Sequence, residues 1–328
     1  MRALSLTQPR QFDWIDIPEP PPPAPGEATV AIRAIGICGT DLGGYLGKMP
    51  FIEYPRILGH ELGVEVLAVG EGVTHLKPGD RCSVEPYLNC GHCAPCLAGR
   101  TNCCETLAVL GVHTDGGMTE RLTLPAHKLH PGGSLTFEQL ALVETLGIGC
   151  HAVQRTAVTA QDTVLIIGAG PIGLTALEFA RLAGAATLVL ELNATRRKFV
   201  LQNYPGTEVL SDPPPGPVAD VVFDATGNPA SMAASFHHAR FGGRVCYVGI
   251  TKEPVSLDDP LFHRRELTLL ASRNALPADF TRIISLMQSG QIDTTPWISH
   301  PFSFDDLPDQ MEKFVQPGSG VIKAVATV

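Results

Sequence analysis

The sequence predicts an α/β protein in which a β-rich first domain precedes a doubly wound parallel sheet. The chain has 328 residues, more than one hydrophobic core comfortably serves, so we expect two domains. From residue 163 to residue 272, apolar runs alternate with helix-like stretches, which is typical of a parallel sheet covered on both faces. Before that region, short alternating runs are cut by Pro and Gly at close intervals, which favours β structure.

The first domain is expected over residues 1–150. The runs ATVAIRAIGI and LGVEVLAVG predict strands, and the 33 Gly and 28 Pro of the chain imply many turns rather than long helices. Residues from about 86 to 106 hold clustered cysteines among Pro and Gly. We expect this stretch to form a small lobe of the first domain.

The second domain is expected over residues 151–274. The strand-like runs TVLIIG, TLVLEL, VADVVFDATG and GGRVCYVGI alternate with the helical patterns IGLTALEFARLAG, ATRRKFVLQN and SMAASFHHAR. After the strand-like TEVL, only SDPPPGP stands where a crossover helix is usual. Roughly nine extended residues reach about 30 Å, and crossing three strands takes only about 15 Å. We therefore predict a Pro-rich loop there.

Residues 275–328 are expected to return to the first domain. They contain one helical pattern, DFTRIISLMQSG, and end in the strand-like VIKAVATV. Just before them, ELTLLAS has the pattern of an exposed edge strand that could pair between subunits. This pattern alone leaves the oligomeric state open.

The net charge and the hydropathy of the chain argue against several classes of partner and location. A formal net charge of −9 argues against nucleic acid or an anionic membrane as a partner. No apolar run approaches the ~20 residues of a membrane span, and the first residues lack the layout of a signal peptide, so a cytoplasmic location is expected. The nine Cys form an odd and clustered set, which indicates metal binding rather than disulfides.

The clustered cysteines predict a structural zinc site. Cys90, Cys93 and Cys96 have the spacing C-x2-C-x2-C, and Cys104 follows after seven residues. Four thiolates close a tetrahedral shell around zinc and leave no open position. A reduced loop without metal is the alternative. Cys103 is the other candidate for the fourth ligand, but the spacing favours Cys104.

A second, open metal site is predicted from Cys38 in GICGTD and His60 and Glu61 in ILGHELGVEV. Taken alone, Cys38 is more typical of a buried apolar residue and His60 of a core histidine. Each is flanked by Gly, which lets backbone crowd around an ion. A thiolate, an imidazole and a carboxylate form an incomplete zinc shell with room for water or substrate.

Glu144 is an acidic residue inside the apolar run ALVETLGIGCHAV. A lone buried carboxylate is costly unless it is paired or binds a metal, so we expect Glu144 in the same shell. It could bind the ion directly or through water. The alternative is an acid at a helix N-terminus that the helix dipole stabilises.

Residues 168–173, Gly-Ala-Gly-Pro-Ile-Gly, follow a predicted strand and open a predicted helix, which is the context of a dinucleotide-binding Rossmann unit. Glu191 ends the next predicted strand, where it can accept hydrogen bonds from the ribose hydroxyls and repel a 2′-phosphate. NAD is therefore favoured, while Arg196 and Arg197 keep NADP open. A βαβ unit without nucleotide is the remaining alternative. The predicted pyrophosphate-binding residues are Gly168, Gly170, Pro171, Ile172 and Gly173.

These motifs, in this order, resemble the zinc-containing medium-chain alcohol dehydrogenases, and the polyol and threonine dehydrogenase branch is nearest. The segments GRTNCCE, GVHTDGG, DATGNPASM and SRNALPADF resemble the bacterial L-galactonate and L-gulonate 5-dehydrogenase group, which acts on the C5 hydroxyl of hexonates with NAD. The resemblance covers essentially the whole chain. It implies a GroES-like catalytic domain, a Rossmann domain, two zinc ions, NAD, and a homodimer or homotetramer.

The resemblance also implies roles for single residues. Cys38, His60 and Glu61 correspond to catalytic-zinc positions, and Glu144 to the glutamate that binds the metal or its water. Thr40 would conduct the substrate proton outward, and Glu191 and Arg196 would contact the adenosine ribose. The residues that would line the nicotinamide are Val248, Gly249, Ile250, Ser272 and Arg273.

Three departures from the family pattern stand out. Gly43 occupies a position where relatives often carry His, so the proton relay must differ or run through water. Thr145 follows Glu144 where Pro is usual, and the helix after the third Rossmann strand is missing.

The implied reaction oxidises a secondary alcohol of a polyol or sugar acid. Zinc would lower the pKa of the alcohol, and nicotinamide C4, held within about 3–3.5 Å, would accept the hydride. Arg273 could grip a substrate carboxylate, although a salt bridge or cofactor contact is equally open. A threonine or simple-alcohol dehydrogenase and a non-catalytic NAD and zinc redox sensor are the rival functions. The presence of Cys38, His60 and Glu61 speaks against a zinc-free quinone reductase.

Overall fold

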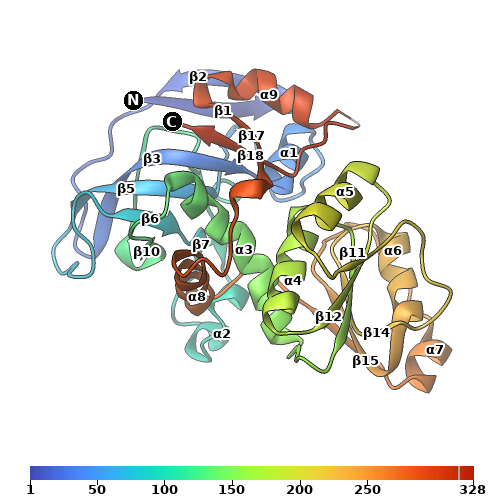
Figure 1. The fold of residues 1–328 in the computed structure, drawn as a ribbon. Helices are drawn as coiled ribbons and strands as arrows, with labels where there is room; N and C mark the ends of the chain where they lie inside the picture. Colours follow the sequence, from blue (N-terminus) through green and yellow to red (C-terminus); the bar gives the residue numbers. More distant parts are fainter. Residues whose placement is uncertain (317) are drawn as a thin grey trace. The chain divides into compact units, whose positions relative to one another are not determined.

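The computed structural model describes residues 1–316 and 318–328, and these form two compact units (Figure 1). The first unit consists of Met1–Glu144 and Leu276–Val328, and the second of Thr145–Ala275. The first unit is therefore built from both ends of the chain, and each unit has its own sheets.

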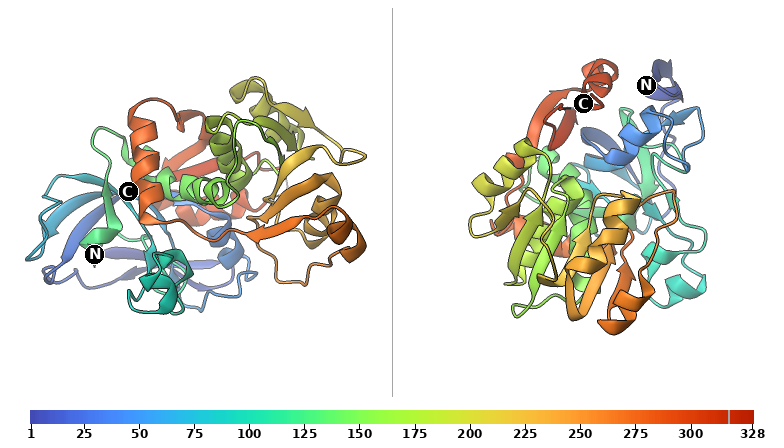
Figure 2. Two further views of the ribbon diagram at one scale, coloured as in Figure 1. Left: turned by 90° about the horizontal axis from the view of Figure 1, so that it is seen from below. Right: turned by 90° about the vertical axis from the view of Figure 1, so that its right-hand side faces the viewer.

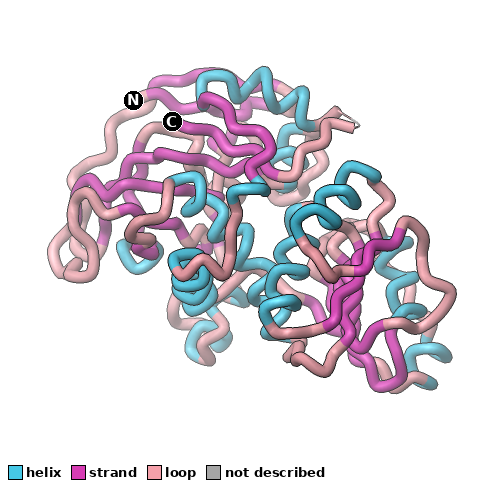
Figure 3. Tube along the Cα trace, in the orientation of Figure 1, coloured by secondary structure: helices cyan, strands magenta, loops and turns pink. Residues whose placement is uncertain are grey.

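Strands dominate the first unit (Figure 3). Its largest sheet has seven strands in the order β10-β6-β5-β3-β18-β17, with β9 also paired to β3. These strands are β3 (Glu27–Ile37), β5 (Glu61–Val69), β6 (Arg81–Val84), β9 (Arg121–Pro125), β10 (Leu129–Pro131), β17 (Ile298–Ser303) and β18 (Lys323–Thr327). The smaller sheets join β1 (Arg2–Gln8), β2 (Gln11–Asp16) and β4 (Arg56–Ile57), and separately β7 (Tyr87–Leu88) and β8 (Ala108–Val109).

The C-terminal strand β18 belongs to the first unit. β18 pairs antiparallel with β3, and Ala324 lies opposite Ile37 in this register. On the other side of β3, β5 pairs antiparallel so that Gly36 lies opposite Glu61. The ends of three strands therefore meet where β3 gives way to α1 and β5 begins.

Apart from the first residues of α3, which continues into the second unit from Thr145 on, the described residues of the first unit form four helices of 12 residues or fewer. They are α1 (Gly39–Tyr45), α2 (Ala94–Leu97), α8 (Pro277–Gln288) and α9 (Leu307–Phe314), and 3-10 turns lie at Thr101–Cys103, Ala126–Lys128, Thr295–Trp297 and Phe304–Asp306. The first-unit core is formed by apolar side chains of the sheet, including Leu4, Ile32, Ile35, Leu62 and Val64.

The 19-residue helix α3 (Phe137–Arg155) was not expected from the β-rich pattern of this region. Its start carries a capping box: Gln139 N–H donates to Thr136 Oγ1 at 3.2 Å, and Thr136 N–H donates to Gln139 Oε1 at 2.9 Å. A Cβ on Gly63 of β5 would lie 1.9 Å from the Phe137 carbonyl oxygen, so glycine lets the helix start approach the sheet. Glu144 lies in the interior of α3.

The second unit is the predicted doubly wound parallel sheet. Its six strands have the order β13-β12-β11-β14-β15-β16 and all pair in parallel. They are β11 (Thr163–Ile167), β12 (Ala186–Leu190), β13 (Glu208–Leu210), β14 (Ala219–Asp224), β15 (Ala239–Tyr247) and β16 (Thr268–Ala271). In Figures 1 and 2, helices lie on both sides of this sheet: α4 (Pro171–Leu182) and α5 (Ala194–Asn203) on one side, α6 (Pro229–Ala234) and α7 (Asp259–Arg264) on the other.

The predicted Pro-rich loop is confirmed. Residues 211–218 connect β13 at one edge to β14 beside β11 and contain no helix. A short 3-10 turn, Ser235–His238, precedes β15. Among the helices of the described residues, none has the length and apolar character to cross a membrane.

Candidate metal centres and cofactor site

Cys38, His60 and Glu61 meet where β3 ends and β5 begins. Each offers a ligand atom, and the three atoms lie within 4.8 Å of one another. Cys38 is the N-cap of α1, while Glu61 is the first residue of β5. A Cβ on Gly36 would lie 2.2 Å from Glu61 Oε2, so only glycine leaves room for this carboxylate.

Asp41 lies close to two of these three residues, Cys38 and His60. Its Oδ2 accepts a hydrogen bond from Cys38 N–H at 2.9 Å, and its Oδ1 lies 3.7 Å from His60 Nδ1. Burial raises the pKa of Asp41. Burial disfavours the imidazolium of His60, but the charges of Asp41 and Cys38 outweigh burial and raise the pKa of His60 well above its usual range.

The donor chemistry fits an open zinc site. Thiolate sulfur, imidazole nitrogen and carboxylate oxygen are all zinc ligands, and three protein ligands leave a position for water or substrate. The Asp41 carboxylate lies 3.7 Å from His60 Nδ1, which is within ion-pair distance but too long for a hydrogen bond. This set therefore has the ligand types that an open zinc site requires, with a carboxylate close to the imidazole.

Lys323, the first residue of β18, forms an ion pair with Glu61. Each of the two side chains is only 1% exposed. Burial disfavours the ammonium group, but the Glu61 and Cys38 charges outweigh burial and raise the pKa of Lys323. A cation at this point offsets the negative charge of the thiolate and carboxylate.

Glu144 lies beside this set without being one of its three members. Its Oε1 accepts a hydrogen bond of 2.5 Å from the Tyr87 hydroxyl. Burial raises the pKa of Glu144, and the charge of His60 opposes that rise. Because Glu144 lies inside α3, the alternative of an acid at a helix N-terminus does not apply.

Thr40 and Gly43 both lie in α1, directly after Cys38. Thr40 is half-buried. A Cβ on Gly43 would meet Met49 Cε at 3.3 Å, so the space at this position is already narrow. A larger side chain here would require Met49 to move.

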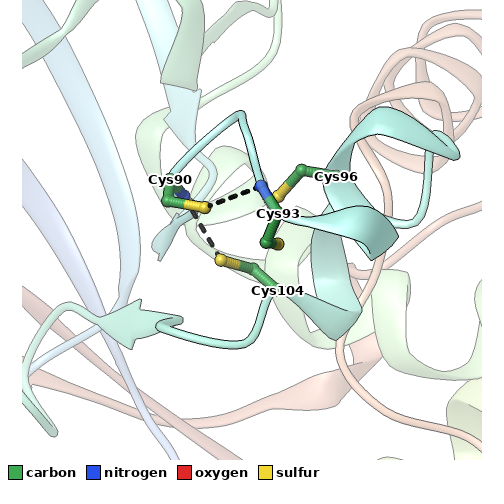
Figure 4. Close-up of side chains that lie close together, drawn as sticks. All are labelled: Cys90, Cys93, Cys96 and Cys104. Carbon is green, nitrogen blue, oxygen red and sulfur yellow. Dashed lines mark hydrogen bonds between the residues drawn. The ribbon is translucent and has the colours of Figure 1, made fainter.

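The sulfur lobe brings Cys90, Cys93, Cys96 and Cys104 together (Figure 4), with ligand atoms within 4.8 Å of one another. The neighbouring Cys103 is exposed and lies outside the group. Figure 4 shows backbone N–H groups donating to sulfur: Cys90 N to Cys104 Sγ at 3.3 Å, and Cys93 N to Cys90 Sγ at 3.4 Å.

These backbone donors alter thiol acidity in the lobe. N–H groups of His92 and Cys93 lower the pKa of Cys90 to about 6. Burial instead raises the pKa of Cys96 to about 11. Four converging sulfur atoms with no further side-chain ligand match a closed tetrahedral site.

The glycine-rich loop after β11 has the geometry that a pyrophosphate site needs. Gly168 adopts φ +91°, and a Cβ on Gly173 would lie 1.7 Å from the Gly168 carbonyl oxygen. Gly170 is the N-cap of α4, with Pro171 and Ile172 in its first turn. A Cβ on Gly170 would contact only Arg196, at 3.6 Å from NH1, so the space in front of the helix N-terminus is open.

Glu191 follows β12 and binds two backbone amides. Its Oε2 accepts from Ala169 N–H and its Oε1 from Asn193 N–H, both at 2.7 Å. Arg196 NH1 lies 3.9 Å from Glu191 Oε2, whereas Arg197 donates to the Glu191 and Leu192 carbonyls. The carboxylate thus lies at the glycine-rich loop.

The segment after β15 runs close to the loop after β14. A Cβ on Gly249 would lie 2.4 Å from Gly227 N, and Ile250 is exposed. Val248 N–H donates to Asp224 O, Ser272 N–H donates to Tyr247 O, and Arg273 is exposed. All these residues follow the carboxyl ends of parallel strands, where ligands bind in open α/β sheets.

Comparisons with known proteins identify the family of the chain. The alcohol dehydrogenase GroES-like domain family matches residues 24–134, and the zinc-binding dehydrogenase family matches residues 171–289. The L-galactonate-5-dehydrogenase of Escherichia coli K12 is 38% identical, covering 100% of this chain and 99% of the relative. This chain belongs to the zinc-binding alcohol dehydrogenase family.

Two further relatives lie in the same family. The L-arabinitol 4-dehydrogenase of Hypocrea jecorina is 33% identical, covering 98% of this chain and 92% of the relative. A solved structure from Escherichia coli CFT073, described as a short chain alcohol dehydrogenase complexed with NADH, superposes with a TM-score of 0.92 at 30% identity and covers 100% of this chain and 99% of that one.

Three residues near the open metal site of this zinc-binding dehydrogenase were not predicted from the sequence: Asp41, Tyr87 and Lys323. Lys323 carried a usable signal, because it is a lone cation in the apolar strand-like run VIKAVATV. The argument that singled out Glu144 applies equally to that lysine. Asp41 and Tyr87 carried no comparable signal, because acidic residues and tyrosines in loops are usually solvated.

Proposed function

We propose that this protein oxidises a secondary alcohol of a polyol or sugar acid, with zinc held by Cys38, His60 and Glu61 and with NAD as hydride acceptor. The single observation that supports this most strongly is the three-ligand set within 4.8 Å, with Asp41 beside His60. When bound there, zinc would supply a Lewis acid that lowers the pKa of the alcohol, and NAD would accept the hydride.

The chain's own residues would orient the substrate and remove its proton. Asp41 holds the turn that carries the Cys38 thiol through a hydrogen bond and places its negative charge next to the His60 imidazole. Thr40, in the first turn of α1, is proposed to accept the hydrogen bond of the substrate hydroxyl and conduct its proton outward. Glu144 is proposed to act beside the ion, directly or through water. The second proposed zinc lies in the sulfur lobe.

A sugar-acid substrate, oxidised at C5 of a hexonate, is supported by the activities after which two relatives are named. These are the L-galactonate-5-dehydrogenase and, at 36% identity, the 2-dehydro-3-deoxy-L-galactonate 5-dehydrogenase of Pseudoalteromonas atlantica. Arg273 is the proposed carboxylate-binding residue. Its guanidinium presents a bidentate fork for that group.

The test is a panel of hexonates, polyols, threonine and simple secondary alcohols, offered with NAD and with NADP to protein of known metal content. We expect NAD reduction to be fastest with hexonates, and Arg273→Ala to raise the hexonate KM. Preference for threonine or simple alcohols would overturn the substrate proposal. No turnover on any alcohol, with NAD still bound, would instead favour a redox sensor.

NAD is proposed over NADP because Glu191 places a carboxylate at the glycine-rich loop. Arg196 is the residue that could offset this charge and accept a 2′-phosphate. Equal kcat/KM for the two cofactors would overturn the preference. Arg196→Ala should then lower the NADP value more than the NAD value.

A homodimer or homotetramer is proposed from the edge of the second sheet. β16 pairs with β15 on one side only, and Leu269 on it is 42% exposed. A second copy of the strand would pair its free backbone groups. Leu269→Pro should shift the mass measured by light scattering from a multimer to the monomer, and a monomeric parent protein would overturn this proposal.

A cytoplasmic location is proposed from the thiol chemistry. None of the nine cysteines, all among the described residues, forms a disulfide. Cys38 and the four lobe cysteines must stay reduced to bind metal, and a reducing compartment keeps them so. Fractionation that places the protein in an oxidising compartment would contradict this.

A further inference from the structure

The segment 85–90, which joins β6 to the sulfur lobe, carries three polar side chains that bond to other parts of the first unit: Glu85, Tyr87 and Asn89. Within it, only Tyr87–Leu88 is a strand, β7. Glu85 is 1% and Tyr87 2% exposed, and Asn89 is half-buried. Glu85 and Asn89 share the partner Lys128, whereas Tyr87 contacts Glu144 and Phe280.

Tyr87 is fixed at both of its ends. Its hydroxyl donates to Glu144 Oε1 at 2.5 Å. Its ring packs edge-to-face on Phe280 of α8, with centroids 6.3 Å apart, and Phe280 in turn stacks on His130 at 4.8 Å. The tyrosine therefore cannot turn away from Glu144 without disturbing the core.

Asn89 connects the same segment to the sulfur lobe. Its amide group donates to Cys96 Sγ at 3.7 Å and accepts from Lys128 Nζ at 2.8 Å. Lys128 also donates to Glu85 Oε1 at 2.5 Å. The next residue, Cys90, is a lobe cysteine whose N–H donates to Cys104 Sγ. A polar network thus runs from the lobe sulfurs along the strand that carries Tyr87.

Glu144 needs such a restraint for a physical reason. It is a buried carboxylate beside a buried set that already contains Glu61, so repulsion between the two would displace it unless a donor holds one oxygen. With Oε1 held by Tyr87, the remaining lone pairs of the carboxylate are free to bind the ion or its water.

We propose that Tyr87 is a positioning residue that holds Glu144 beside the metal at Cys38, His60 and Glu61, and that the sulfur lobe anchors Tyr87 through Asn89. The lobe then does more than stabilise its own loop, because its integrity sets the position of a carboxylate at the open site. This inference deepens the proposed function and rests on a metal being bound at that site.

The test measures how fast zinc leaves the open site. Zinc-loaded protein is mixed with excess 4-(2-pyridylazo)resorcinol, and zinc release is followed by the colour of the dye complex. Tyr87→Phe removes only the hydroxyl, and we expect the faster phase of release to accelerate about 10–100-fold, the usual cost of losing a group that orients a ligand. The slow phase from the lobe should remain unchanged.

Tyr45→Phe is the matched control. Tyr45 is buried, and its hydroxyl likewise donates to a glutamate, Glu312 Oε2, at 3.0 Å. We expect this variant to release zinc at the wild-type rate. Asn89→Ala tests the anchor: it should accelerate the faster phase while leaving all four lobe cysteines in place.

A double-mutant cycle tests whether Tyr87 acts through Glu144. Once Glu144→Gln has removed the charge, adding Tyr87→Phe should change release little. Wild-type release from Tyr87→Phe, or full additivity in the cycle, would overturn the inference, and wild-type release from Asn89→Ala would overturn its anchoring part. If circular dichroism shows that Tyr87→Phe does not fold, a double-mutant cycle of Asn89→Ala with Glu144→Gln tests the inference in its place. Wild-type protein without a faster phase would sink the proposed function instead.

Discussion

Glu61 and Lys323 come from β5 and β18, and both side chains are fully enclosed. Without a metal, each is the other's charge partner. Removing one member of a buried pair leaves the other charge uncompensated, which typically costs about 3–5 kcal/mol. A bound cation would reduce this energetic cost, because it would compensate the charge of the Glu61 carboxylate in place of Lys323.

Lys323→Met should therefore lower the free energy of unfolding of metal-free protein by about 3–5 kcal/mol, and that of zinc-loaded protein by less. Urea unfolding of both forms measures this. Lys313→Met on exposed α9 is the control, expected within about 0.5 kcal/mol of wild type. Equal effects of Lys323→Met and Lys313→Met would show that the ion pair of Glu61 and Lys323 does not contribute to stability.

The lobe cysteines should differ in their response to pH. The pKa of Cys90 is lowered to about 6 by backbone N–H groups, whereas burial raises the pKa of Cys96 to about 11. In metal-stripped protein, Cys90 is therefore a thiolate at neutral pH and becomes protonated as the pH falls through about 6. Because the thiolate is the nucleophile, alkylation of Cys90 by iodoacetamide should fall over that range.

Cys96 is the internal control in the same sample. It should react slowly throughout, since its thiol stays protonated far above neutrality. Mass spectrometry of the labelled peptides measures both rates. Parallel pH profiles for the two cysteines would contradict the assigned role of the backbone donors.

At the scale of single residues, the sequence predicted the ligand types better than their environment. Cys38, His60 and Glu61 could be selected because their chemistry is that of zinc ligands and glycines flank them. The pairing of Glu61 with Lys323 could not be selected in the same way. It depends on β18 returning beside β3, which brings together residues far apart in the chain.

Among the elements, α3 shows where pattern reasoning failed. Thr136 and Gln139 have the T-x-x-Q spacing of a capping box, and the structure forms both of its hydrogen bonds. The spacing is visible in the sequence, whereas the apolar run that follows is compatible with either a buried strand or a buried helix. Here the capping spacing was the better guide.

The glycine-rich loop and α4 give a prediction at this scale. Gly173→Ala should lower stability by about 1–3 kcal/mol, because its Cβ would lie 1.7 Å from the Gly168 carbonyl oxygen. Gly170→Ala should keep wild-type stability, since its φ of −69° suits alanine and its Cβ would meet only Arg196. Both should bind NADH more weakly.

Thermal unfolding and NADH fluorescence titration separate the two effects. Loss of stability in Gly173→Ala with wild-type stability in Gly170→Ala is the expected result. Undiminished NADH affinity in Gly170→Ala would mean that the cofactor does not approach the helix N-terminus as proposed.

For the whole molecule, the fold class could be predicted well, because the spacing of apolar residues along the chain indicates which faces of its strands and helices are buried. Continuous apolar strands between amphipathic helices indicated a parallel sheet, and the structure has its six strands in doubly wound order. The length of the stretch SDPPPGP sufficed to predict a loop crossing without a helix. Substrate identity could not be predicted in this way, because it depends on side chains from many separate segments.

The central claim is that the chain holds an ion at Cys38, His60 and Glu61 in addition to the one in its sulfur lobe. The most direct measurement is the zinc content per chain, by mass spectrometry of the element, in wild-type protein and in His60→Ala. We predict two zinc ions in wild type and one in His60→Ala, with alcohol oxidation lost in the variant. One ion in both proteins, or two in both, would contradict the account.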